Sequence, residues 1–231
     1  MARAAREIGL ASVELLDPPE WPVVQKFGLT CAIANGPMTI AAGLNRLEHH
    51  AALVPAMIAR IEECAAAGVP AVIAFSGNRA GLPDELGLEH CARALKPIVG
   101  AAEKRGVTVC MELLNSKIDH TDYMCDRTAW GVELVRRVGS ERFKLLYDIY
   151  HMQIMEGDVI RTIQQHHACI GHYHTGGNPG RHEIDATQEL NYPAIARAIA
   201  ATGFRGFVGQ EFIPTRDPLV SLREAVELCR V

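Results

Sequence analysis

The sequence predicts an α/β fold, a parallel (β/α)8 barrel that lacks its first β-strand. Strand and helix patterns alternate about seven times along the 231 residues, and no pattern typical of a hairpin interrupts them. Closed barrels of this class commonly take about 250 residues, which is close to the length of this chain. The chain begins inside a helical pattern, so the strand that would precede the first helix is absent.

The first half of the chain is divided by glycine and proline. Gly9 and Gly68 end helical patterns, and Asp17-Pro18-Pro19 and Gly36-Pro37 end strand patterns. The apolar run Val69–Phe75 is typical of a parallel strand that is buried on both faces. We expect, in order, helix Ala4–Gly9, strand Ala11–Leu16, helix Glu20–Phe27, strand Leu29–Asn35, helix Asn45–Gly68, strand Val69–Phe75 and helix Leu88–Gly106.

The second half continues the alternation and contains the most informative segment. Residues Ile170–His174 alternate like a strand, and a loop rich in glycine, proline and asparagine follows them up to Asp185. Such a strand delivers side chains to the rim of an active site. We expect strand Val107–Leu114, helix Asp126–Val138, strand Phe143–Ile149, helix Val159–His166, strand Ile170–His174, helix Pro193–Thr202, strand Phe207–Phe212 and helix Pro218–Cys229.

The composition is typical of a globular protein, with 48% hydrophobic and 22% charged residues. No linker divides the chain, so we expect residues 1–231 to form one domain. The net charge of −4 gives no reason to expect nucleic acid or a membrane as a partner, and no apolar run reaches the ~20 residues needed to span a bilayer. The seven scattered cysteines and the absence of a signal-peptide pattern favour a cytoplasmic location.

Four polar residues interrupt or end the last four expected strands: Glu112, Asp148, His174 and Glu211. Their gaps of 36, 26 and 37 residues are each close to one strand–helix unit. In a barrel, such positions converge at the carboxyl ends of the strands. Three carboxylates and one imidazole predict a divalent-cation site that favours Mn²⁺ or Mg²⁺, and the histidine makes Zn²⁺ or Co²⁺ compatible.

Each of these residues also has a structural interpretation when it is taken alone. A carboxylate at a strand end is more often a helix cap or an ion-pair partner, and a single histidine is more often a hydrogen-bonded core residue. The prediction therefore rests on the set, because buried charges are costly unless they are paired or metal-bound. His151 and Arg181 are candidates for substrate binding, and the sequence assigns no role to Glu14.

The segments that carry this chemistry resemble a known family. They are MELLN (111–115), YDIYHMQ (147–153), GHYHTGGNPGRHEID (171–185), ELNYPAI (189–195) and GQEFIP (209–214). They are similar to the hydroxypyruvate isomerases, within the xylose-isomerase-like TIM-barrel group of sugar isomerases and epimerases. The resemblance implies a metal held by Glu112, Asp148, His174 and Glu211, with the two glutamates as the acid–base pair and His151 and Arg181 as substrate-binding residues.

Departures from the family pattern leave alternatives open. Hydroxypyruvate isomerases tend to have glutamine at the position of His174, whereas ketose 3-epimerases have histidine there. Epimerases in turn tend to carry an acidic residue at the position of Ile118. The main hypothesis is isomerisation of hydroxypyruvate to tartronate semialdehyde through an enediolate. The alternatives are a ketose 3-epimerase, a dehydratase of the same fold group, and a truncated, non-catalytic protein that binds metal or ligand. The family often forms homo-oligomers.

Overall fold

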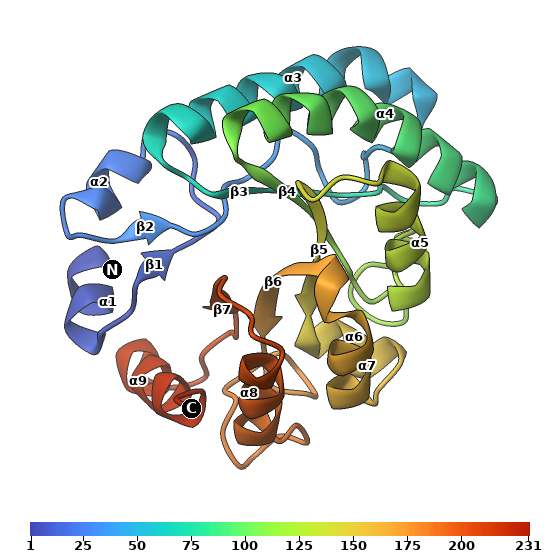
Figure 1. Cartoon of the computed structure of the whole chain (residues 1–231). Coiled ribbons are helices and arrows are strands. Elements are labelled where there is room, and N and C mark those ends of the chain that lie inside the picture. Colours follow the sequence, from blue (N-terminus) through green and yellow to red (C-terminus); the bar gives the residue numbers. More distant parts are fainter.

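Short parallel strands form the centre of the molecule and helices form its outer layer, in a computed structural model that describes residues 1–231 (Figure 1). One parallel sheet contains five strands in sequence order: β3 (Ala71–Ala74), β4 (Thr108–Glu112), β5 (Phe143–Asp148), β6 (Ile170–Thr175) and β7 (Val208–Gln210). Two further strands, β1 (Ser12–Val13) and β2 (Thr30–Cys31), form a parallel pair. The predicted α/β barrel class is confirmed.

The two sheets are joined into one incomplete ring. Single parallel bridges link Leu16 to Ala34 and Ala34 to Val72, which places the extension of β2 beside β3. No strand pairing joins β7 to β1, and Figure 1 shows these two strands facing each other across an opening in the ring. The sequence predicted seven strands and no strand ahead of the first helix, and the topology agrees.

The expected strands Ala11–Leu16 and Leu29–Asn35 are much shorter than predicted, with only two ladder residues each. One cause is visible in the backbone, because Leu15 has a φ of +55°. A residue other than glycine rarely adopts this left-handed backbone conformation, and a residue in this conformation cannot continue a strand. The turn directs Leu15 toward the cavity described below.

Nine α-helices surround the strands. Their bounds are α1 (Ala2–Ile8), α2 (Trp21–Gln25), α3 (Leu47–Ala67), α4 (Asp84–Arg105), α5 (Thr128–Val138), α6 (Ile149–Met155), α7 (Val159–His166), α8 (Tyr192–Ala201) and α9 (Pro218–Leu228). A short 3-10 turn covers His167–Cys169. None of the helices combines the length and the apolar character needed to cross a lipid bilayer.

Two helices differ clearly from the prediction. Helix α4 begins at Asp84 instead of Leu88, directly after Pro83, with Asp84 and Glu85 in its first turn where the helix dipole favours acidic groups. Helix α6 was not predicted. It begins directly after β5 because the side chain of Asp148 accepts a hydrogen bond from the backbone N–H of His151 at 2.9 Å, which caps the helix.

The core lies between the sheet and the helices. All four residues of β3 are buried, as the apolar run predicted. On α3, Met57, Ile61 and Cys64 are fully buried at helical spacing, and they pack in the main hydrophobic cluster. Packing on both faces fixes the register of the strands, so polar side chains at the strand ends are held in defined positions.

Candidate active site

The four predicted ligand residues converge at the carboxyl ends of the strands. Glu112 and Asp148 are the last residues of β4 and β5, His174 is the penultimate residue of β6, and Glu211 directly follows β7. The strand register pairs Asp148 directly with His174. One ligand atom from each of the four residues lies within 4.8 Å of all the others. The structure therefore brings together the set that the sequence singled out.

His174 lies at the centre of the three carboxylates. Its Nδ1 atom is 2.7 Å from Glu211 Oε2, 3.3 Å from Glu112 Oε1 and 3.8 Å from Asp148 Oδ2. The ring is fully buried, and neither of its nitrogens makes a hydrogen bond of acceptable geometry. Buried polar atoms are almost always satisfied. An unsatisfied imidazole nitrogen facing three carboxylate oxygens fits a divalent cation, which such donors coordinate.

Burial and the neighbouring charges shift the acid–base properties of this cluster. Burial raises the pKa of Glu112 to about 7. Burial also acts to raise the pKa of Asp148, but His151, which is protonated at the low pH where Asp148 titrates, and Arg181 outweigh it and lower the pKa to about 2. Despite its burial, the surrounding carboxylates hold the pKa of His174 well above its usual value. The cluster thus favours positive charge at its centre.

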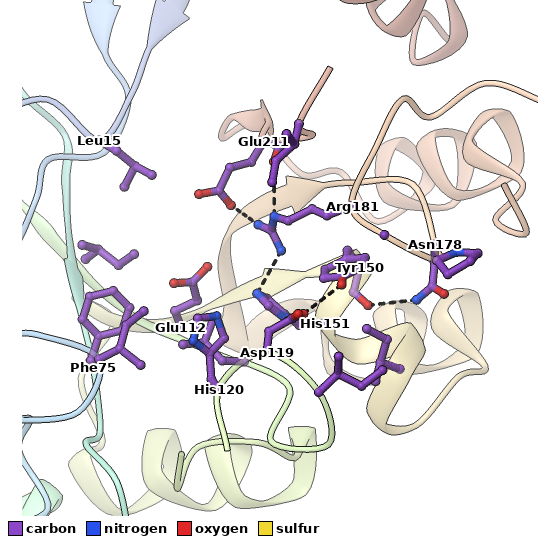
Figure 2. A pocket seen from close by; sticks show the side chains of 18 of the residues that line it. Leu15, Phe75, Glu112, Asp119, His120, Tyr150, His151, Asn178, Arg181 and Glu211 are labelled. Atoms are coloured by element: carbon purple, nitrogen blue, oxygen red, sulfur yellow. Dashed lines mark hydrogen bonds and ion pairs between the residues drawn. The ribbon is translucent and has the colours of Figure 1, made fainter. Parts of the chain in front are cut away.

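The Arg181 side chain contacts two of these carboxylates, those of Asp148 and Glu211. Its Nη2 atom donates to Asp148 Oδ2 at 2.7 Å. Figure 2 shows its contacts with Glu211 and with His151, whose Nε2 atom is 2.9 Å from Arg181 Nη1. The guanidinium carbon lies 4.9 Å from the centre of the Tyr150 ring, a cation–π contact. The sequence predicted Arg181 as a substrate-binding residue but did not predict its contact with two candidate metal ligands.

A tight turn after β6 places Arg181 in the site. Gly177 N donates to the carbonyl of His182 at 2.9 Å, so the loop folds back on itself. A Cβ atom at Gly177 would lie 2.2 Å from the carbonyl oxygen of Glu183, and only glycine allows this close approach. The carbonyl of Arg181 in turn accepts from Ile213 N, which ties the loop to the segment that carries Glu211.

His151, in the first turn of α6, is held by a polar network. Its Nδ1 atom is 2.6 Å from Asn115 Nδ2, and Asn115 Nδ2 also donates to Asp119. The hydroxyl of Tyr150 donates to Asp119 at 2.8 Å. Burial lowers the pKa of His151 to about 4, so its imidazole is neutral at pH 7. Asp119 and Tyr150 were not among the predicted site residues, and only the polar loop Asn115–Tyr123 drew attention to this region.

A cavity of about 690 Å³ opens above the cluster (Figure 2). Of the predicted site residues, Glu112, His151, Arg181 and Glu211 line it, whereas Asp148 and His174 lie below and are fully buried. Much of the remaining wall is apolar, including Leu15, Ile40, Ile73, Phe75, Leu114, Ile118, Ile154 and Ile213. A concave site with apolar walls and a few convergent polar groups is typical of small-molecule binding.

A second group of side chains lies behind the cluster. Glu14, directly after β1, has Oε2 2.7 Å from His172 Nε2 and Oε1 3.5 Å from His174 Nε2. The contact connects the first strand with the sixth. The sequence assigned Glu14 no role, because nothing in its local pattern distinguishes it from a solvent-facing carboxylate on a strand.

Known proteins share this architecture. A family model described as xylose isomerase-like TIM barrel matches residues 2–230. A putative hydroxypyruvate isomerase of Homo sapiens is 26% identical over 227 residues, covering 96% of this chain and 77% of that protein. A 2-oxo-tetronate isomerase of Cupriavidus necator is 39% identical over 114 residues, 49% of this chain and 43% of that protein.

A solved structure agrees with the family model. The crystal structure of AP endonuclease, family 2 from Brucella melitensis superposes with a TM-score of 0.90 at 26% identity, covering 98% of this chain and 91% of that chain. The match of the family model over nearly the whole chain shows the family. The chain belongs to the xylose isomerase-like TIM barrel family.

Proposed function

We propose that this protein is a divalent-metal-dependent isomerase that converts hydroxypyruvate to tartronate semialdehyde. The observation that carries the proposal is that Glu112 and Glu211 both line the cavity and both approach His174, so two carboxylates can act on one small substrate. The relatives named as hydroxypyruvate isomerase and 2-oxo-tetronate isomerase support a small hydroxy-oxo acid as the substrate class.

In this proposal, Glu112, Asp148, His174 and Glu211 hold the cation. The oxygen-rich donor set favours Mn²⁺ or Mg²⁺, and His174 makes Zn²⁺ or Co²⁺ compatible. When bound, the cation polarises the substrate carbonyl and makes the neighbouring C–H more acidic. The buried, unsatisfied nitrogens of His174 support this assignment.

The two glutamates carry the proton transfer. One removes a proton from C3 of hydroxypyruvate and the other delivers a proton to C2, while the hydroxyl proton moves from O3 to O2. These steps balance, since the substrate and the product have the same composition. Both carboxylates line the cavity, and Glu112 is buried whereas the side chain of Glu211 is 31% exposed.

Arg181 and His151 bind and orient the substrate. Arg181 presents a planar guanidinium to the cavity, and a substrate carboxylate can replace part of its contacts with Asp148 and Glu211. His151 is neutral at pH 7, and its Nε2 atom faces Arg181 Nη1 at the cavity. A substrate oxygen that takes the place of this contact can accept a hydrogen bond from the Nε2–H of His151 as negative charge develops on that oxygen.

The test combines metal analysis with an activity assay. Protein dialysed against a chelator should be inactive, and Mn²⁺ or Mg²⁺ at one equivalent should restore conversion of hydroxypyruvate, followed by NMR of the product. The Glu89→Gln variant, which changes an exposed carboxylate outside the site, is the matched control. Metal-independent turnover, or no binding of any of the four cations, would contradict the proposal.

A ketose 3-epimerase is the second candidate. His174 favours it, because ketose 3-epimerases resemble this chain at that position. Ile118 opposes it, since this residue lines the cavity and is 67% exposed at a position where epimerases tend to carry an acidic group. Parallel assays with hydroxypyruvate and D-fructose distinguish the two. The cytoplasmic location and a homo-oligomeric state stay predictions.

A further inference from the structure

The two ring nitrogens of His174 face different groups. Nδ1 faces the three carboxylates of the proposed cation site, whereas Nε2 lies 3.5 Å from Glu14 Oε1. A neutral imidazole carries its proton on one nitrogen and has a lone pair on the other. His174 can therefore ligate a cation through Nδ1 only when the proton is on Nε2. The group next to Nε2 decides which form is favoured.

Glu14 presents a carboxylate oxygen to His174 Nε2 at 3.5 Å, a distance that would have to shorten for a hydrogen bond to form. An ionised carboxylate has acceptor sites only, and the two oxygens of Glu14 face the Nε2 atoms of two different histidines. Oε2 lies 2.7 Å from His172 Nε2, and this ring is nearly fully buried. His172 precedes His174 by two residues on β6, so it lies one layer deeper on the same face of the strand. The contact with His172 thus anchors the carboxylate beside His174.

A glycine on β7 makes room for this carboxylate. The strand register places Gly209 directly beside His174. A Cβ atom at Gly209 would lie 1.5 Å from Glu14 Oε1 and 2.5 Å from its Cδ, so any other residue would displace the Glu14 side chain. This observation is independent of the contacts with the histidines. Glu14 reaches this position from β1, across the opening in the ring between β1 and β7 (Figure 1).

We propose that Glu14 is a positioning residue that acts through His174. Its carboxylate accepts a hydrogen bond from the Nε2–H of His174, which keeps Nδ1 unprotonated with its lone pair facing the cation site. The inference rests on the cation site proposed above. In metal sites, the second nitrogen of a ligating histidine usually donates to a carboxylate, a carbonyl or a water, and losing that partner lowers metal affinity about 10–100-fold.

The same three side chains could instead form a second cation site, because their donor atoms lie within 4.8 Å of one another. The contact of 2.7 Å between Glu14 Oε2 and His172 Nε2 favours a direct hydrogen bond. Two ligand atoms on one tetrahedral ion would be farther apart, about 3.3 Å for bonds of about 2.0 Å. The number of cations bound per chain distinguishes the two arrangements.

The first experiment measures Mn²⁺ binding to the chelator-dialysed full chain by titration calorimetry. Glu14→Gln keeps the size of the side chain but presents one donor to the histidines, and Gly209→Ala keeps Glu14 but displaces its carboxylate. Both variants should bind one Mn²⁺ with a Kd raised about 10–100-fold. The matched controls are Glu89→Gln, at an exposed carboxylate, and Gly100→Ala, where a Cβ meets nothing within 4 Å.

The second experiment observes the ring directly in the Zn²⁺-loaded, ¹⁵N-histidine-labelled protein. The wild type should show Nε2 of His174 protonated and protected from exchange with water, and both variants should lose that protection while retaining the circular dichroism of the folded chain. An unchanged Kd in both variants, or two cations bound per chain, would overturn the proposal. Mn²⁺ binding without hydroxypyruvate turnover would remove the proposed activity and leave this inference standing, and a wild type that binds no cation would remove both.

Discussion

Arg181 Nη2 donates to Asp148 Oδ2 at 2.7 Å, so a guanidinium from the loop after β6 pairs with the fully buried carboxylate at the end of β5. The same nitrogen contacts Glu211. A single cationic side chain therefore pairs with two carboxylates of the proposed cation site and lines the cavity. This relationship connects metal binding with substrate binding through one residue.

Replacing Arg181 with lysine should weaken substrate binding more than it slows chemistry. Lysine retains the charge but loses the planar pair of donors that matches a carboxylate. We expect KM for hydroxypyruvate to rise about 10-fold or more, with a smaller change in kcat. Steady-state kinetics measure both values. Arg161→Lys, at an exposed ion pair on α7, is the control and should change neither. An unchanged KM in Arg181→Lys would exclude Arg181 as the carboxylate-binding residue.

Two variants separate the structural role of Asp148 from its role as a proposed ligand. Asn in place of Asp148 retains an oxygen that can accept from His151 N, whereas alanine removes the cap of α6. Both variants should lose Mn²⁺ binding, and Asp148→Ala should be less stable than Asp148→Asn by about 1 kcal/mol. Calorimetry measures the first property and urea unfolding the second. Equal stabilities would show that the cap contributes nothing to the fold.

Replacing either glutamate with glutamine should abolish most of the turnover. Glu112→Gln and Glu211→Gln each remove one partner of the proposed proton transfer, and we expect kcat to fall by about 100-fold or more. Elemental analysis at saturating Mn²⁺ identifies effects that arise only from lost metal. A Glu211→Gln protein with normal metal content and full activity would contradict the mechanism.

Glu183 should make the stability of the protein depend on pH. Its carboxylate accepts from the backbone N–H and hydroxyl of Thr215 and from the hydroxyl of Ser221. Although its desolvation acts in the opposite direction, these hydrogen bonds lower the pKa of Glu183 from 4.5 to about 2. A lowered carboxyl pKa contributes stability that is complete above about pH 4.5 and is lost as the pH falls toward 2.

The measurement compares Glu183→Gln with the wild type by urea unfolding at pH 7 and at several lower values. Glu183→Gln should have a lower free energy of unfolding than the wild type at pH 7, and the difference should shrink as the pH falls below about 4.5. Glu89→Gln should show no such difference. A difference that is independent of pH would mean that packing, and not the charge of Glu183, is responsible.

Local sequence patterns were sufficient to predict the fold and the convergence of Glu112, Asp148, His174 and Glu211, because both follow from the repeated strand–helix unit. Each of the last four strands carries one of these residues at or next to its carboxyl end, and parallel strands align those ends at one edge. Helix α6 was missed because the apolar run around Asp148 has no period that separates a strand from a helix. Asp148, three residues before His151, is nevertheless a typical N-cap residue and could have predicted the start of α6.

Contacts between distant segments could not be predicted from the sequence. The left-handed conformation of Leu15 shortens β1, although leucine does not favour it and no neighbouring residue signals it. The pairing of Arg181 with Asp148 depends on a turn that only the folded backbone defines. Glu14 meets His172 across the opening between β1 and β7, and no local sequence pattern predicts that contact.

The hydrogen bond between Glu14 and His172 joins residues that are 158 positions apart. Bringing such distant segments together requires a large loss of chain entropy, which grows with the length of the intervening loop. Parallel strands are joined only through whole helices, so few local contacts offset this loss early in folding. We therefore expect the contact between the first and sixth strands to form late, and a nascent chain will complete His174's environment only after most of the protein has been synthesised.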